Sequence, residues 1–129
     1  MKKYIAVAAA LVTLGVGTLV SAGLKYSTPV SISLSGRNLS GSLGGARNSP
    51  DSAQYIQIEY YAGGASTEVI VLARAANGTF AYCWSSDPNI VTMARAVSEG
   101  ASISVNWNAN NECTFLYVSV SSYDAPKIP

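Results

Sequence analysis

The stretch TEVIVLARAANGTFAYCWS, residues 67–85, decides the fold class because it has the pattern of two strands joined by a turn. Residues 67–75 are apolar on both faces at their centre, which predicts a strand in the interior of a sheet. Asn77-Gly78 is a strong hairpin signal, since both residues tolerate the positive φ of a type I′ turn. Residues 79–85 then alternate aromatic with small side chains. The stretch therefore predicts an antiparallel β-hairpin.

Similar patterns predict strands on either side of this hairpin. Alternation of apolar and polar residues indicates four further strands, at residues 29–35, 53–61, 101–107 and 113–121. The side chains of the second of these divide between two faces, with Ile56, Ile58 and Tyr60 on one and Tyr55, Gln57, Glu59 and Tyr61 on the other. Because the turns are short, antiparallel neighbours are the economical arrangement.

One helix is predicted directly after the hairpin. Asp87 suits the N-cap and Pro88 the first helical position. Gly100 ends the pattern, whose apolar residues recur at the spacing of one helix face: Ile90, Met93, Ala94 and Val97. We expect this stripe, Met93 included, to pack in the core.

Together these elements predict an α+β fold, a mostly antiparallel β-sheet with one short helix packed on it. The alternative is a β-sandwich in which the helix serves as a connection. The core is expected to combine the helix stripe and the aliphatic strand residues with four large aromatic residues: Phe80, Trp84, Trp107 and Phe115.

The first 22 residues have the features of a secretory signal peptide. Two lysines precede an uncharged apolar run at residues 4–20, and small residues at 20–22 suit cleavage after Ala22. The alternative is a retained transmembrane anchor, although the run is near the lower length limit for spanning a bilayer. Cleavage would leave one secreted or periplasmic α+β domain, residues 23–129, with no membrane attachment.

The charge of the exported part excludes some partners. Removal of residues 1–22 takes two of the eight basic residues and leaves six, scattered among seven acidic residues. Nucleic acid is therefore excluded as a partner, because its binding needs a basic face that neutralises phosphates. The chain also lacks the polybasic cluster that attracts proteins to anionic membranes.

The exported part contains two cysteines, Cys83 and Cys113. An even pair in an oxidising compartment predicts a disulfide bond. Such a bond would close a loop of about 31 residues and contribute about 3.5 kcal/mol on the chain-entropy model.

The sequence gives no sign of a catalytic site. It contains no histidine, which removes the commonest general base and most transition-metal sites. A glycosidase needs two facing carboxylates, and the spacing of the carboxylates here predicts no such pair: Asp51, Glu59, Glu68, Asp87, Glu99, Glu112 and Asp124. We therefore expect a non-enzymatic protein with no cofactor and no metal site.

Candidate binding residues lie in and after a glycine-rich stretch, residues 36–52, which we expect to be a long loop. Arg47 and Asp51 are four residues apart, and Pro50 can open a single helical turn around them. A salt bridge or capping bond would then brace the loop against the next strand. The alternative is that Arg47 and Asp51 form a ligand site.

Tyrosine supplies the other candidates, Tyr55 and Tyr61. Aromatic residues in rows on a strand face can contact glycan or protein. They are also good strand formers that pair across strands, so a purely structural role is the alternative.

Several segments resemble a group of small, exported, cysteine-bearing bacterial proteins of unassigned function. The segments are GSLGGARNSPDSAQYI (41–56), ARAANGTFAYC (73–83), SSDPNIVTMARAV (85–97), SISVNWNANNECT (102–114) and SSYDAPK (121–127). That group shares an ARxSxDS.QYI pattern, and the resemblance covers roughly residues 40–127. It implies a further cysteine pair near the positions of Ile58 and Val71 in many members, on neighbouring strands. It implies no activity.

Two functions are consistent with these patterns, and a third, a small hydrolase, would require a buried or cleft-bound pair of carboxylates. The first is a recognition domain that binds an unknown glycan or protein through outward tyrosines or the 36–52 stretch, and it predicts an exposed aromatic patch beside that stretch. The second is a structural subunit of the cell envelope or matrix that self-associates through strand edges such as residues 67–73, whose low charge suits β-pairing.

Overall fold

The computed structural model of the protein describes residues 26–124, so the predicted signal peptide and its cleavage site lie outside the described residues. This part of the chain forms strands and two short helices in the order β1 (Ser31–Ser33), β2 (Asn38–Ser42), α1 (Leu43–Arg47), β3 (Tyr55–Gly63), β4 (Ser66–Arg74), β5 (Phe80–Ser85), α2 (Pro88–Ala94), β6 (Ala101–Trp107) and β7 (Cys113–Val120). The prediction of an α+β fold built on antiparallel strands is confirmed.

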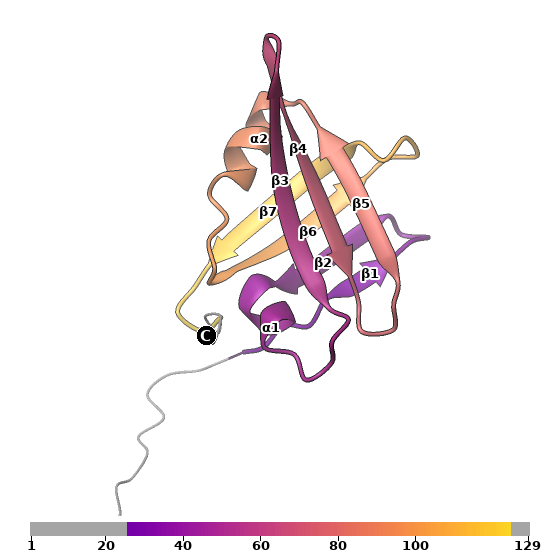
Figure 1. Ribbon diagram of the computed structural model, residues 1–129, viewed down its shortest axis with the longest axis vertical. Coiled ribbons are helices and arrows are strands. Elements are labelled where there is room, and N and C mark those ends of the chain that lie inside the picture. Colours follow the sequence, from indigo (N-terminus) through magenta and orange to yellow (C-terminus); the bar gives the residue numbers. More distant parts are fainter. Residues whose placement is uncertain (1–25, 125–129) are drawn as a thin grey trace, which may run out of the picture.

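The strands form two antiparallel sheets. One sheet has the order β1–β2–β6–β7 and the other the order β3–β4–β5. In Figure 1 the three-stranded sheet crosses in front of the four-stranded sheet, with α1 near one end of the molecule and α2 near the other. Helix α2 connects β5 to β6 and packs against β4 and β7. Two sheets in two layers, with a helix that connects them, are the features that the alternative prediction of a β-sandwich with a helical connection described.

Aliphatic residues fill the space between the sheets. Alternate residues of β4 and β6 are buried, and β2 contributes Leu39, which is fully buried. The largest strand side chains that are fully buried are Leu39, Val69, Val71, Val105 and Cys83, and Trp107 of β6 is buried as predicted, at 8% exposed. These β-branched and aliphatic side chains suit a pleated, inward-facing surface.

The predicted disulfide bond joins Cys83 to Cys113 with a Cα–Cα distance of 5.1 Å. It connects β5 of one sheet to β7 of the other, and both residues are buried. Beside it, the Trp84 backbone N–H donates to the carbonyl of Asn111 at 2.9 Å. The disulfide and this hydrogen bond join the two sheets along one side.

The predicted core was wrong at three large residues. Phe80, Met93 and Phe115 are 44%, 44% and 51% exposed. Cys83 must point inward to reach Cys113, and alternation along β5 then turns Phe80 outward. In α2 the Asp87 cap and the Pro88 start are confirmed, but Val91 is buried in place of Met93.

The stretch 36–52 is not one long loop, because it contains β2 and α1. β2 pairs with β1 on one side and β6 on the other. Ser42 is the N-cap of α1 and accepts a hydrogen bond from the backbone N–H of Gly45 at 2.9 Å. The glycines allow close packing, since a Cβ atom on Gly45 would lie 2.6 Å from the carbonyl oxygen of Thr28.

The β4–β5 hairpin forms as predicted, but its turn is longer than the expected type I′ turn. Five residues separate the strands, and Gly78 has a positive φ of 85° while Asn77 does not. The backbone N–H of Gly78 donates to the carbonyl of Ala75 at 2.9 Å. A type I′ turn would need the left-handed conformation at both Asn77 and Gly78, whereas only Gly78 adopts it here.

Strand β4 is the middle strand of its sheet, so the prediction that residues 67–75 form an interior strand is confirmed. Because both sides of β4 are paired, residues 67–73 cannot be the free strand edge through which self-association was predicted. Ile58 and Val71 are direct cross-strand partners on β3 and β4. Apolar side chains therefore occupy the pair of positions at which the resemblance implies cysteines.

Candidate functional site

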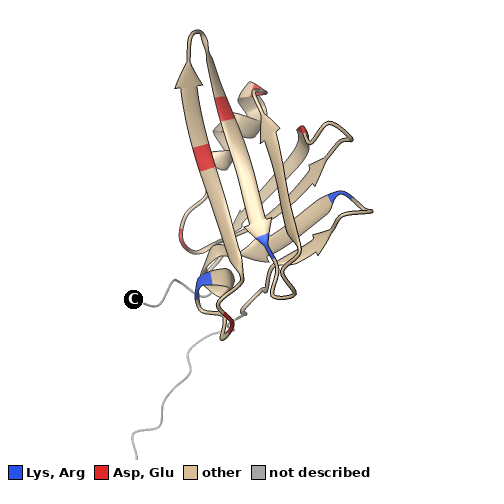
Figure 2. Cartoon of the chain, turned by 45° about the vertical axis from the view of Figure 1, so that its right-hand side comes forward, with Lys and Arg blue, Asp and Glu red and all other residues tan. Residues whose placement is uncertain are grey.

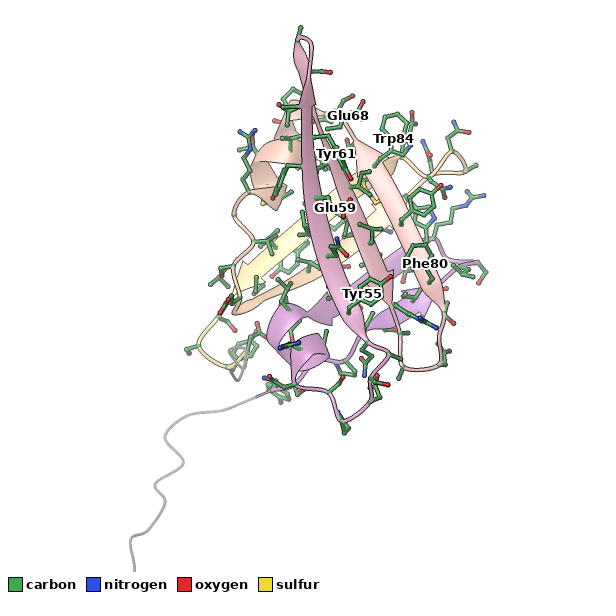
Figure 3. The ribbon with its side chains drawn as sticks, in the orientation of Figure 1. Tyr55, Glu59, Tyr61, Glu68, Phe80 and Trp84 are labelled. Atoms are coloured by element: carbon green, nitrogen blue, oxygen red, sulfur yellow. A yellow bond between two sulfur atoms is a disulfide. The ribbon has the colours of Figure 1, made fainter. Side chains whose placement is uncertain are left out.

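The outer face of the β3–β4–β5 sheet is the candidate site. Val69, Val71 and Ala73 are buried, which fixes the inner side of β4, and the strand register then identifies the side chains of the outer face. Figure 3 labels six of them. We call this surface the aromatic face; it consists of Tyr55, Gln57, Glu59 and Tyr61 of β3, Glu68, Ile70, Leu72 and Arg74 of β4, and Phe80, Tyr82 and Trp84 of β5.

Aromatic, aliphatic and polar side chains share this surface. Three rows run over all three strands, and the first contains Tyr55, Arg74 and Phe80. The next two contain Gln57, Leu72 and Tyr82, and then Glu59, Ile70 and Trp84. Directly opposed residues lie about 4.5–5.5 Å apart, so every ring has a neighbour in contact range. A ligand on this face can stack on rings and form hydrogen bonds at once.

Glu59 is the centre of a hydrogen-bond network on β3. Its carboxylate accepts from the hydroxyl of Tyr61 at 2.7 Å and from the side-chain amide of Gln57. The hydrogen bond to Glu59, together with the negative charge of that carboxylate, raises the pKa of Tyr61 above its ordinary value. Tyr61 therefore remains a neutral hydrogen-bonding group at neutral pH, held beside a charged acceptor.

Charge is unevenly distributed over the aromatic face. Figure 2 shows one acidic position near the middle of β3 and one on β4 closer to the hairpin, whereas the basic position of β4 lies at the end away from the hairpin. Arg74 is paired in register with Tyr55 and Phe80, and Glu68 is paired with Tyr61. Charged groups thus lie among the rings at the middle of the surface as well as at both of its ends.

The β5 aromatic residues were missed as surface residues because large rings were expected in the core. Phe80 and Tyr82 are 44% and 43% exposed, and their ring centroids are 6.2 Å apart. The signal was present in the sequence. A disulfide-forming Cys83 faces inward, so its alternating neighbours Tyr82 and Trp84 must face outward.

The four predicted site residues fall into two places. Arg47, Asp51 and Tyr55 line one shallow hollow between α1 and the start of β3. Tyr61 lies near the other end of β3, beside Glu59 and Glu68. Tyr55 and Tyr61 are both on the aromatic face, so the structure brings the two tyrosines onto one surface. Arg47 and Asp51 are not part of this face and lie in the hollow beside Tyr55.

Asp51 braces the segment that leads into β3. Its carboxylate accepts from the backbone N–H groups of Ala53 at 2.8 Å and Gln54 at 2.9 Å, and from the side-chain amide of Gln54. The carbonyl oxygen of the Gln54 side chain in turn accepts from the backbone N–H of Val30 at 2.8 Å. These bonds, those to Gln54 above all, lower the pKa of Asp51 to about 2.

Arg47 takes no part in this brace. It is the last residue of α1 and is exposed, and no ion pair joins it to Asp51 in the described part of the chain. The expected helical turn at Pro50 is absent as well, because the helix comes earlier and ends at Arg47. Asp51 therefore forms hydrogen bonds to backbone N–H groups without capping a helix, and the salt bridge to Arg47 does not form.

Replacement of Asp51 by Ala should speed amide exchange at Ala53, Gln54 and Val30. Arg47→Ala is the matched control and should leave these rates unchanged. The folded pKa of Asp51 is about 2 and its ordinary value is 3.8, so the bonded carboxylate stabilises the segment above pH 3.8. That contribution should be lost as the pH falls from about 4 toward 2. Hydrogen exchange followed by mass spectrometry or NMR measures both effects; equal protection in wild type and Asp51→Ala contradicts the brace.

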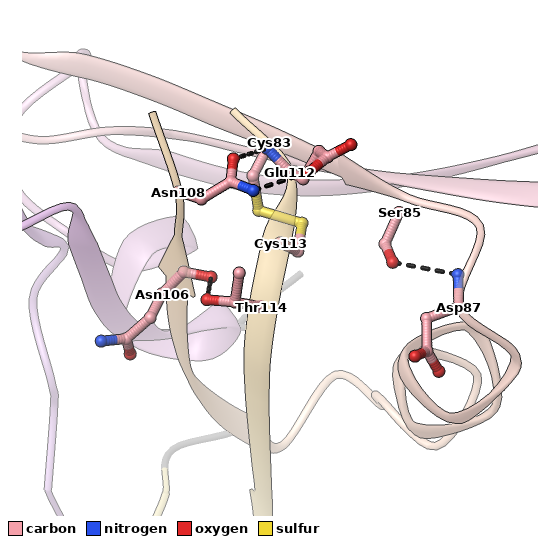
Figure 4. The surroundings of a disulfide bond; sticks show 8 residues. All are labelled: Cys83, Ser85, Asp87, Asn106, Asn108, Glu112, Cys113 and Thr114. Carbon is pink, nitrogen blue, oxygen red and sulfur yellow. Dashed lines mark hydrogen bonds between the residues drawn. A yellow bond between two sulfur atoms is a disulfide. The ribbon is translucent and has the colours of Figure 1, made fainter. Parts of the chain in front are cut away.

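A second hollow lies beside the disulfide bond and is lined by two carboxylates, Asp87 and Glu112 (Figure 4). Asp87 caps α2 by accepting from the backbone N–H of Asn89 at 2.7 Å. Glu112 accepts from the side-chain amide of Asn108 at 2.6 Å. Within residues 26–124, no three His, Cys, Asp or Glu side chains form a group that could hold a metal ion.

The opposite surface, the outer face of β1–β2–β6–β7, is chemically different. It is formed mostly by serine and asparagine, with two aromatic residues on β7, Phe115 and Tyr117. Tyr117 is 54% exposed. This face provides a control position for a ring on the far side of the molecule.

The chain was compared with known proteins. No family model, curated protein or solved structure matches it. In the described residues, neither helix has the length and apolar character needed to cross a bilayer. The Cys83–Cys113 bond is compatible with an oxidising compartment.

Proposed function

We propose that the protein is an exported, non-catalytic recognition domain that binds a glycan chain on the aromatic face. The observation that carries this proposal is the gathering of five aromatic side chains, from three strands, on one outward surface. Burying them against a ligand removes apolar area from water. The adjacent Gln57, Glu59 and Arg74 supply the donors and acceptors that sugar hydroxyls require.

The distribution of charge favours a glycan over a protein. The centre of a protein–protein interface is depleted of charged residues. On the aromatic face, however, Glu59 lies in the same row as Trp84, and Arg74 lies between Tyr55 and Phe80. A sugar ring offers an apolar C–H face and a rim of hydroxyl groups, so it can use rings and charged acceptors side by side.

The surface also suits an extended ligand. A small molecule needs a concave pocket that buries most of its surface. The rings here are spread over a sheet, from Tyr55 and Phe80 at one end to Tyr61 at the other. A chain of several sugar units can contact successive rows. The signal-like first 22 residues and the disulfide bond both support export.

Replacement of Phe80 and Tyr82 together by Ala should weaken glycan binding by about tenfold or more. Each aromatic contact contributes about 0.5–1.5 kcal/mol, so two losses approach or exceed a factor of ten. Affinity electrophoresis against a panel of soluble polysaccharides (xylan, β-glucan, chitosan and pectin) measures the effect as lost retardation. Both residues are exposed, so the variant should keep the far-UV and near-UV spectra of a folded chain.

Tyr117→Ala is the control, since it removes an exposed ring from the opposite face. It should leave retardation unchanged. If no polysaccharide retards the wild-type protein, the glycan proposal is wrong. If Tyr117→Ala abolishes retardation while the double variant keeps it, the ligand lies on the other sheet.

A further inference from the structure

Strand β3 has an open edge. It is nine residues long and pairs with β4 on one side only. In Figure 1 it runs along the margin of the front sheet, and its hairpin with β4 projects beyond the rest of the molecule. Within residues 26–124, no strand pairs with its other side. An edge of this length presents a row of backbone groups that another strand can use.

The hairpin geometry fixes which residues present those groups. Gly63 and Ser66 flank a two-residue turn whose first residue, Gly64, has a φ of 61°. The flanking pair of such a turn is hydrogen-bonded, and hydrogen-bonded pairs alternate along an antiparallel ladder. The odd-numbered residues of β3 therefore bond to β4. The even-numbered residues Ile56, Ile58 and Tyr60 direct their backbone N–H and C=O groups to the open side.

The usual protection against strand pairing is limited to the start of the strand, where α1 packs against β3. Natural edges carry lysine, proline, a bulge or a covering element. β3 contains no lysine or proline, has Glu59 as its single charge, and pairs with β4 in unbroken register. Its open side is also apolar toward the core, where Ile56 and Ile58 are half-buried and Tyr60 is 44% exposed.

The other sheet edges are less available. β1 has three residues. β5 is joined to the other sheet by the hydrogen bond from Trp84 to Asn111 and by the disulfide bond. β7 shares that disulfide and is covered in part by α2. β3 is thus the long edge that remains open in the described chain.

We infer that β3 pairs antiparallel with β3 of a second copy of the chain, about a two-fold axis at Ile58. In this register Ile58 lies opposite Ile58 of the partner subunit as a hydrogen-bonded pair, as its outward backbone groups require. Ile56 lies opposite Tyr60 of the partner subunit, which covers the apolar side of both. On the outer side, Tyr55 lies opposite Tyr61 of the partner subunit.

Charge selects this register over its neighbours. Gln57 lies opposite Glu59 of the partner subunit, so an amide meets a carboxylate on each side of the axis. A shift of the axis to Glu59 would place the two Glu59 carboxylates opposite each other, and like charges directly opposed destabilise a strand pair. A shift to Gln57 would place Tyr55 opposite the partner's Glu59 and lose the contact between tyrosine rings.

The dimer extends the aromatic face across six strands and does not depend on glycan binding. Its test needs no polysaccharide, and it changes residues of β3, whereas the glycan test changes residues of β5. A monomer that binds xylan would support the glycan proposal alone, and a dimer that binds no glycan would support the dimer alone.

Sedimentation equilibrium of the disulfide-bonded protein should show a mass that rises from one chain to two as concentration increases. Gln57→Glu places carboxylates opposite each other at two symmetric positions and should weaken the dimer roughly tenfold. The double variant Gln57→Glu/Glu59→Gln exchanges the two groups and should restore it. Ile58→Pro removes an outward N–H and should abolish the dimer without breaking the β3–β4 ladder.

A cysteine at the axis tests the register. Hydrogen-bonded partners have Cα atoms about 5.5 Å apart, within the range of a disulfide bond, so Ile58→Cys should oxidise to a covalent dimer. Ile56→Cys is the matched control, because each copy of residue 56 lies four positions along the strand from its symmetry mate. It should remain monomeric on a denaturing gel without reductant.

The inference is overturned by a single-chain mass at all concentrations up to the millimolar range. A dimer that neither Gln57→Glu nor Ile58→Pro weakens also overturns it, since association then uses another surface. Equal cross-linking at positions 56 and 58 contradicts the register. If Ile58→Pro fails to fold, the exchange of Gln57 and Glu59 still decides the outcome.

Discussion

Replacement of both cysteines by Ala should lower the free energy of unfolding by about 3.5 kcal/mol. The bond between Cys83 and Cys113 closes a loop with a sequence separation of 30, and its loss frees that loop in the unfolded chain. A domain of this size buries a limited core, so such a loss is a large share of its stability. Urea unfolding followed by tryptophan fluorescence measures the change.

Reductant supplies the control for this prediction. Wild-type protein treated with dithiothreitol should approach the stability of the double variant, and the variant itself should not respond to reductant. Ala is the appropriate replacement because both positions are buried and a serine hydroxyl would need a partner there. Equal urea midpoints for wild type and variant would show that the bond between the sheets contributes nothing.

The parts of the fold that were predictable depend on short-range chemistry. Asp87 and Pro88 start α2 through local effects that need no distant partner. The Asp87 side chain accepts hydrogen bonds from backbone N–H groups of the first turn, and the fixed φ of Pro88 suits the first helical position. Residues 101–107 alternate strictly and form β6 with the predicted bounds. The two cysteines also needed no further context, since they were the only pair available.

The missed parts depend on partners distant in sequence. β2 contains one large apolar residue, Leu39, among small polar ones, so it has no alternating signal. It is a strand because β1 and β6 pair with it. The outward position of Phe80 likewise follows from a cysteine that must reach another sheet. The aromatic face was therefore predictable only in part, from Tyr55 and Tyr61, whereas its β5 half required the disulfide geometry.

The glycines of the 36–52 stretch were expected in a long loop, and the structure gives Gly45 a role in packing. Gly45 lies in α1 and is buried against the segment that precedes β1. Thr28 is held there because its carbonyl accepts from the backbone N–H of Ser42 at 3.1 Å and from the Ser42 hydroxyl at 3.3 Å. Close packing, and not mobility, explains a glycine at this position.

Gly45→Ala should therefore destabilise the fold by about 1–3 kcal/mol. The added Cβ would lie 2.5 Å from the Ser42 hydroxyl oxygen and 2.6 Å from the Thr28 carbonyl oxygen, so it displaces the cap of α1 and meets backbone that cannot rotate away. Alanine gains up to about 1 kcal/mol over glycine in helix propensity, which is smaller than the expected cost of the clash. Gly100→Ala is the matched control, since its Cβ would meet nothing within 4 Å, and its effect should stay within about 0.5 kcal/mol. A urea midpoint for Gly45→Ala at or above that of Gly100→Ala would mean that α1 can move away from Thr28 at no cost, and that the glycine serves flexibility after all.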